Sequence, residues 1–60
     1  MKFWVARDID DMLFIFSKKP RLNKKMGWFL SDSYYSIVDK RFFPEVTFKN
    51  SPQEIELKLI

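Results

Sequence analysis

The fold of this 60-residue chain is decided by residues 2–17, which read KFWVARDIDDMLFIFS. Two apolar runs, residues 2–7 and 12–17, flank the acidic segment 8–11, whose carboxylates can hydrogen-bond the nearby backbone and favour a turn. A helix that begins in the acidic segment is the competing interpretation, since Asp is a good N-cap. The second run, however, is aromatic and β-branched and ends shortly before Pro20, so length and composition favour a strand. We therefore predict a β-hairpin over residues 2–17.

Both strands of this hairpin are apolar on both of their faces. Phe3 and Val5 lie on one face of the first strand, and Trp4 and Ala6 lie on the other. A strand with one face in water would alternate apolar and polar residues instead. We expect the hairpin at the centre of a curled sheet or small barrel, with both faces covered.

Further strands are expected along the rest of the chain. Residues 28–30 and 34–38 are apolar segments separated by Ser-Asp-Ser, and we predict that they form a second hairpin. Residues 46–48 are predicted to be extended. Residues 54–59 alternate apolar and charged side chains with period two, which is typical of a strand with one face on the core. This strand could pair beside residues 2–7 and close the sheet, and at a sheet edge its charged face would oppose aggregation.

Two positions call for irregular backbone. Gly27 is the sole glycine, and it stands where a chain leaving a loop needs an unusual backbone angle or a close approach. Asp39 could cap one short helical turn near residues 39–43, with Phe42 and Phe43 buried beneath it. The predicted fold class is thus mainly β: one small domain over the whole chain, with five or six short antiparallel strands in a curled sheet or barrel of SH3-like or OB-like size.

The composition of the chain excludes several kinds of catalytic and metal site. The chain has no Cys and no His, so disulfides and the usual zinc ligand sets are excluded, and the commonest general base and the strongest nucleophile are missing. The acidic segment does not make an EF-hand loop, because Met12, Leu13 and Lys19 stand where ligands or glycine are needed. We expect no enzyme activity, no metal and no cofactor. Eleven aromatic residues in 60 read first as the means of holding a small core together.

A basic segment gives the first functional hypothesis. Residues 18–26 are polar and predict a loop, and the chain's formal net charge is +3. Its cations could contact phosphates while nearby aromatic rings stack on bases, as in nucleic-acid binders built on small barrels. The alternative interpretation is that the basic residues are simply solvated and that the aromatic rings fill the core. The residues in question are Lys18, Lys19, Arg21, Lys24, Lys25, Trp28, Tyr34 and Tyr35.

A protein-interaction or structural module is the main functional hypothesis. Eleven aromatics exceed what one small core holds with ease, and any ring left outside, such as Trp4, Trp28, Tyr34 or Tyr35, would be an interface anchor. The partner would be an unknown protein or a second copy of the chain in a homodimer. No signal peptide, membrane helix or basic amphipathic helix is recognisable, so we expect a cytoplasmic location and no membrane partner.

The order of features resembles a loose group of short, uncharacterised proteins from gut bacteria and their phages. The likeness is carried by the segments WVARD at 4–8, LFIF at 13–16, FPEVTF at 43–48 and the Ser-Pro at 51–52. Members of the group often have glycine in the first turn, where this chain has Asp11 or Met12. The resemblance implies a bacterial or mobile-element origin and a compact, mostly β fold, and it implies no function.

Overall fold

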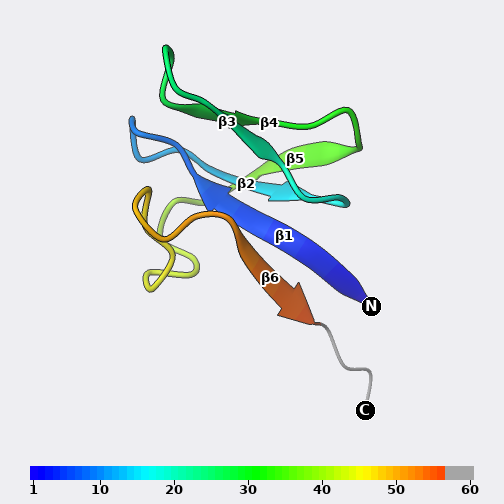
Figure 1. The fold of residues 1–60 in the computed structure, drawn as a ribbon. Helices are drawn as coiled ribbons and strands as arrows, with labels where there is room; N and C mark the ends of the chain where they lie inside the picture. Colours follow the sequence, from blue (N-terminus) through cyan, green and yellow to red (C-terminus); the bar gives the residue numbers. More distant parts are fainter. Residues whose placement is uncertain (57–60) are drawn as a thin grey trace.

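The computed structural model describes residues 1–56, which contain six short strands and no helix (Figure 1). Four strands form an antiparallel sheet in the order β5-β2-β1-β6, and the remaining two, β3 and β4, form a separate antiparallel hairpin. The mainly β prediction is confirmed. The strands are β1 (Lys2–Arg7), β2 (Leu13–Phe16), β3 (Arg21–Asn23), β4 (Trp28–Leu30), β5 (Tyr35–Val38) and β6 (Gln53–Glu56).

The predicted first hairpin is confirmed and forms the centre of the sheet. β1 and β2 pair from Trp4 opposite Phe16 to Arg7 opposite Leu13. The connecting turn is closed by hydrogen bonds from the Asp8 amide to Met12 O (2.8 Å) and from the Asp11 amide to Asp8 O (3.0 Å). Asp11 has a φ of 74°, the left-handed conformation that follows a type I turn in three-residue hairpin loops. The alternative helix is wrong because this turn leads directly into the β2 ladder.

The two faces of the sheet are covered by different segments. On the first face Val5, Leu13 and Val46 are buried; the segment between β5 and β6 covers this side, and we name it the loop face. On the second, Ala6 and Phe16 are buried together with Phe29 of β4, so we name it the hairpin face. The prediction that both faces of the central strands are covered is confirmed.

The predicted second hairpin, residues 28–38, is wrong in its pairing. β4 pairs with β3 and β5 pairs with β2, so residues 31–34 cross between the two sheets instead of forming a hairpin turn. The crossing is held by Ser33, whose hydroxyl accepts the Lys18 amide, and by the Ser17 amide, which donates to Tyr34 O. Residues 18–26 were predicted as a loop but contain β3, a strand that its polar sequence does not indicate.

The segment between β5 and β6 is irregular. Residues 46–48 are not a strand. Near 39–43 one turn is closed by the Phe42 amide on Asp39 O at 2.9 Å, without a helix. Phe43 packs on the loop-face core, but Phe42 is 59% exposed, which contradicts its predicted burial. Since Pro44 follows at once, the turn is too short to cover both rings.

The C-terminal strand lies at the sheet edge beside β1, as predicted. β6 pairs antiparallel with β1, and its Glu54 and Glu56 are exposed while Ile55 packs toward the core. The rest of the predicted strand, residues 57–59, lies outside the described residues. Among residues 1–56 no closed barrel forms, because β5 and β6 stand at opposite edges of the sheet.

Gly27 confirms both expectations for the sole glycine. Its φ is +72°, and a Cβ at this position would lie 2.5 Å from Cγ2 of Ile9. The Ile9 amide also donates to Gly27 O at 2.9 Å. The small residue thus lets the β1–β2 turn approach the start of β4 and docks the β3–β4 hairpin on the sheet.

Candidate interaction cleft

A cleft of about 600 Å³ opens on the hairpin face between β4 and the β2–β5 half of the sheet. β3 and β4 are three residues long each, so the hairpin they form covers only part of a four-stranded sheet. Its buried anchor, Phe29, sits beside Ala6 of β1 and Phe16 of β2. The outer part of the face, toward β5, stays open to solvent. A volume of this size is within the usual range of ligand pockets.

The walls of the cleft are mostly apolar and partly exposed. Met12, Trp28, Leu30 and Tyr35 line it with exposed fractions between 36% and 58%. Isolated apolar side chains on a surface are common, whereas a contiguous apolar patch around a hollow marks a binding surface. Trp28, Leu30 and Tyr35 come from two strands that are not hydrogen-bonded to each other, so the fold itself gathers them.

Three rings form one wall. Tyr35 lies opposite Phe16 in the β2–β5 ladder, and its ring centroid is 5.9 Å from that of Phe16 and 6.1 Å from that of Phe14. The Phe14 and Phe16 rings are 6.3 Å apart. These separations lie within the range of favourable aromatic pairs. The mutual contacts hold the exposed Tyr35 ring in place as part of a preformed wall.

Two carboxylates line the cleft, those of Asp8 and Asp10. Asp8 is 6% exposed, and its Oδ1 accepts the buried Phe29 amide at 3.0 Å. Asp10 is exposed, and its Oδ1 accepts the Met12 amide. Burial raises the pKa of Asp8 above its ordinary value, opposed by the Phe29 hydrogen bond and reinforced by the nearby charge of Asp10. The described residues that line the cleft include no Lys or Arg, so its charge is negative in a chain that is positive overall.

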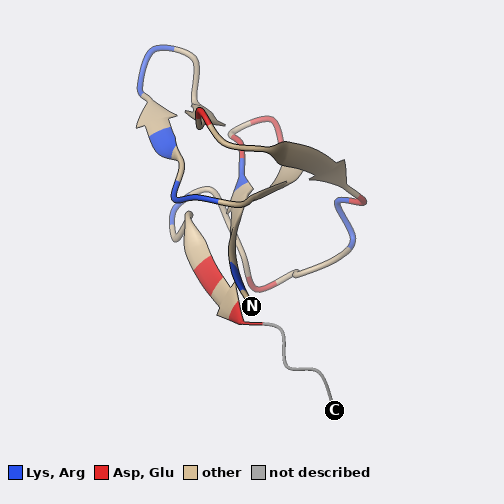
Figure 2. Cartoon of the chain, turned by 90° about the vertical axis from the view of Figure 1, so that its right-hand side faces the viewer, with Lys and Arg blue, Asp and Glu red and all other residues tan. Residues whose placement is uncertain are grey.

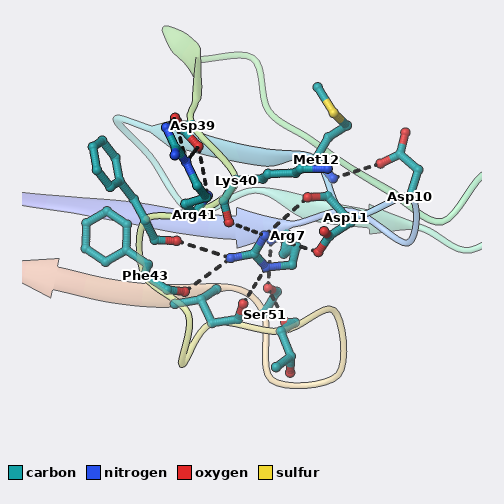
Figure 3. Close-up of polar contacts among 12 residues, drawn as sticks. Arg7, Asp10, Asp11, Met12, Asp39, Lys40, Arg41, Phe43 and Ser51 are labelled. Carbon is teal, nitrogen blue, oxygen red and sulfur yellow. Dashed lines mark hydrogen bonds and ion pairs between the residues drawn. The ribbon is translucent and has the colours of Figure 1, made fainter.

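Arg7 organises the opposite face of the sheet (Figure 3). The residue is 8% exposed, and its guanidinium donates to Val46 O at 2.6 Å and to the carbonyls of Lys40, Phe42 and Phe43 at 3.1–3.2 Å. It also contacts the carbonyl and the carboxylate of Asp11, each at 3.2 Å. The side chain therefore holds the irregular segment onto the loop face, and we assign it a structural role.

The predicted basic residues do not line the cleft, although Arg21 lies opposite the cleft residue Leu30 in the β3–β4 ladder. Lys18 and Lys19 precede β3, Arg21 begins it, and Lys24 and Lys25 form the tip of the hairpin (Figure 2). A three-residue strand separates the two ends of this row by about 10 Å. Lys19 is already engaged, with Nζ 5.5 Å from the centroid of the Trp4 ring.

The structure thus divides the predicted site residues into two groups. Trp28 and Tyr35 line the aromatic cleft. The five cations lie in and beside β3 and do not line it. Tyr34 is 77% exposed and is also absent from the cleft lining. Bases stacked in the cleft would bring phosphates toward carboxylates rather than toward Lys or Arg. Sequence reasoning missed Asp8 as a buried group. Strand parity could have found it, because Asp8 continues the Trp4 and Ala6 face of β1 beyond its last residue.

Residues 1–56 hold no group of three or more acidic residues placed to bind a metal ion. The same part of the chain contains no helix that is long and apolar enough to span a membrane. The cytoplasmic location expected from the sequence stays a prediction.

Comparison with known proteins gives no family for this chain. No protein-family model matches its sequence, no curated protein is similar to it, and no solved structure matches its fold.

Proposed function

We propose that this chain is a non-enzymatic protein-interaction module that binds a partner in the aromatic cleft between β4 and the β2–β5 half of the sheet. The observation that carries the proposal is the exposure of Met12, Trp28, Leu30 and Tyr35 around one preformed hollow of about 600 Å³. Apolar and aromatic side chains that gather in a partly desolvated recess are the usual anchors of protein interfaces.

The large apolar side chains that the core leaves exposed support this proposal. The buried Phe16 and Phe29 already fill the hairpin-face core, and Phe29 contacts Phe48 with ring centroids 6.0 Å apart. Trp28 and Leu30 flank Phe29 in β4 and line the cleft with it, and they are 40% and 52% exposed whereas Phe29 is buried. Their large apolar side chains are therefore available to a partner.

A random-peptide display library selected on the immobilised chain provides the test. We expect selected peptides to lose about tenfold in affinity for Leu30→Gln, since burying the exposed half of a leucine side chain contributes about 1–1.5 kcal/mol. Leu22→Gln is the matched control, because Leu22 is 40% exposed on the same hairpin but does not line the cleft. Equal affinity for wild type and Leu30→Gln would place binding elsewhere and refute the proposal.

Nucleic-acid binding is the second candidate. It is favoured by one observation: the eight residues 18–25, which include β3, carry five cations and no acid. The residues that would contact phosphates are Lys18, Lys19, Arg21, Lys24 and Lys25. Titration with single-stranded and duplex oligonucleotides at two salt concentrations tests it. Phosphate contacts predict binding that weakens steeply with salt and is lost in Lys24→Glu/Lys25→Glu, and no binding at low salt would remove this candidate.

A further inference from the structure

We infer that the cleft takes a basic side chain, Lys or Arg, of a separate partner protein, with its cationic head between Asp8 and Asp10 and its stem against the aromatic wall. This inference rests on the proposed function and names the chemistry of the partner.

The charged residues that line the cleft favour a cationic group of the partner. Asp8 and Asp10 are the charged residues in the lining of the cleft, and residues 1–56 place no cation there. Asp8 is 94% removed from solvent (6% exposed), yet its one hydrogen-bond donor from the described residues is the neutral Phe29 amide on Oδ1. No buried side-chain oxygen of the described residues lacks a hydrogen-bond partner, so Oδ2 of Asp8 is within reach of solvent, and a guanidinium or ammonium there would replace water with charge-assisted hydrogen bonds.

Arg7 precedes Asp8 in the chain, but its guanidinium is hydrogen-bonded to other groups. Its guanidinium pairs with Asp11 at 3.2 Å and donates to four carbonyls of the segment between β5 and β6. Arg7, Asp8 and Lys40 line a second hollow, but no ion pair joins Asp8 to a cation of the described residues. The protein itself therefore leaves the Asp8 carboxylate without a cation.

The rings supply the second part of the site. Trp28 and Tyr35 stand at the mouth, 40% and 58% exposed, and Phe14 and Phe16 continue the wall inward. Aromatic faces attract Lys and Arg heads and pack against their methylene stems. A carboxylate pair beside an aromatic wall is thus suited to one extended cationic side chain flanked by apolar neighbours.

A second copy of this chain is a poorer occupant. No Lys or Arg of residues 1–56 lines the cleft, and Lys19 already lies over the Trp4 ring, so the chain's own cations are less available than those of a different protein. We therefore assign the occupant to a different protein.

The test uses three acetylated, amidated tripeptides as probes: Leu-Arg-Leu, its citrulline analogue, which keeps the shape without the charge, and its glutamate analogue. Each is titrated into the ¹⁵N-labelled chain while the Phe29 amide and Trp28 indole resonances are followed. We expect Leu-Arg-Leu to bind at least tenfold more tightly than the citrulline analogue, and the glutamate analogue to bind more weakly still. Asp8→Asn, which retains an oxygen acceptor for the Phe29 amide, should abolish the preference for arginine, and Asp10→Asn should reduce it.

The outcomes separate this inference from the proposed function. Equal binding of the arginine and citrulline peptides, lost in Leu30→Gln, would keep the cleft as an interaction site and overturn the basic partner. No shift with any probe, or an arginine preference that survives Asp8→Asn and Asp10→Asn together, would also overturn it. A dimer in sedimentation equilibrium that Asp8→Asn dissolves would place a second copy in the cleft and contradict the separate partner.

Discussion

Replacing Arg7 by methionine keeps an apolar stem of similar length and removes the guanidinium that holds the loop face together. That group makes six contacts, with Val46 O, Lys40 O, Phe42 O, Phe43 O and two oxygens of Asp11. In Arg7→Met the carbonyls lose a donor in a region where the residue was 8% exposed, so water replaces it poorly.

The expected loss in the free energy of unfolding of Arg7→Met is large compared with the stability of so small a domain. The Asp11 carboxylate is 64% exposed and is readily solvated, but each carbonyl that is left buried without its donor costs about 1–3 kcal/mol, and these costs are not additive. A single core in a chain of this length rarely supplies more than about 3–5 kcal/mol. Arg7→Met should therefore be largely unfolded at 25 °C, while Arg7→Lys, which keeps the charge and fewer donors, should fold with reduced stability.

Urea unfolding followed by far-UV circular dichroism measures the effect. Arg41→Met is the matched control, because Arg41 pairs with Asp39 at 2.9 Å on an exposed surface, and its urea midpoint should not change measurably. Hydrogen exchange on Arg7→Lys should show the earliest opening at residues 40–46. An Arg7→Met protein within about 1 kcal/mol of wild type would refute the structural role assigned to Arg7.

Substitutions at Asp11, at Gly27 and at Asp8 test the turn geometry and the buried carboxylate. Asp11→Gly should be more stable than Asp11→Ala by about 1 kcal/mol in urea unfolding, because φ is 74° and only the glycine is unstrained there; equal stabilities would contradict that geometry. Gly27→Ala should lose about 2 kcal/mol, from its φ of +72° and the clash with Ile9, and adding Ile9→Ala should restore only part of this; full restoration would mean that the backbone is unstrained. The raised pKa of Asp8 means that the folded state binds its proton more tightly than the unfolded state, so its contribution to stability is present below the ordinary value of 3.8 and is lost as pH rises through the folded pKa. The stability of Asp8→Asn relative to wild type should therefore be greater at pH 7 than at pH 4, and a smaller difference at pH 7 would show that burial does not raise this pKa.

Periodicity in the sequence predicted the parts of the fold that pair through regular apolar patterns. The alternating faces of β1 and β2 and the alternation around Ile55 in β6 predicted the centre and one edge of the sheet. β3 was missed because Arg21-Leu22-Asn23 has no strand pattern, and it is extended because it pairs with β4. The wrong partner for β5 has the same origin, since nearness along the chain favoured β4 and the better apolar match lay with Phe14 and Phe16 of β2.

The candidate site was predictable only in part. Composition indicated that some rings would remain outside, and Trp28 and Tyr35 are among them. Strand parity continues the Trp4 and Ala6 face of β1 to Asp8, but the amide that Asp8 accepts belongs to Phe29 of β4, 21 residues away, so the sequence alone does not reveal this partner. The cleft itself arises from the mismatch between a short hairpin and a wider sheet, which is a property of the pairing and not of any single segment.

The claim at the centre of this account is that the cleft between β4 and the β2–β5 half of the sheet is the binding surface. Amide chemical-shift mapping of the ¹⁵N-labelled chain with a library-selected peptide tests it most directly. We expect the largest shifts on Met12, Trp28, Leu30 and Tyr35, and in Leu30→Gln we expect the same shifts to need about tenfold more peptide. Shifts concentrated on residues 18–25, or unchanged by Leu30→Gln, would contradict it.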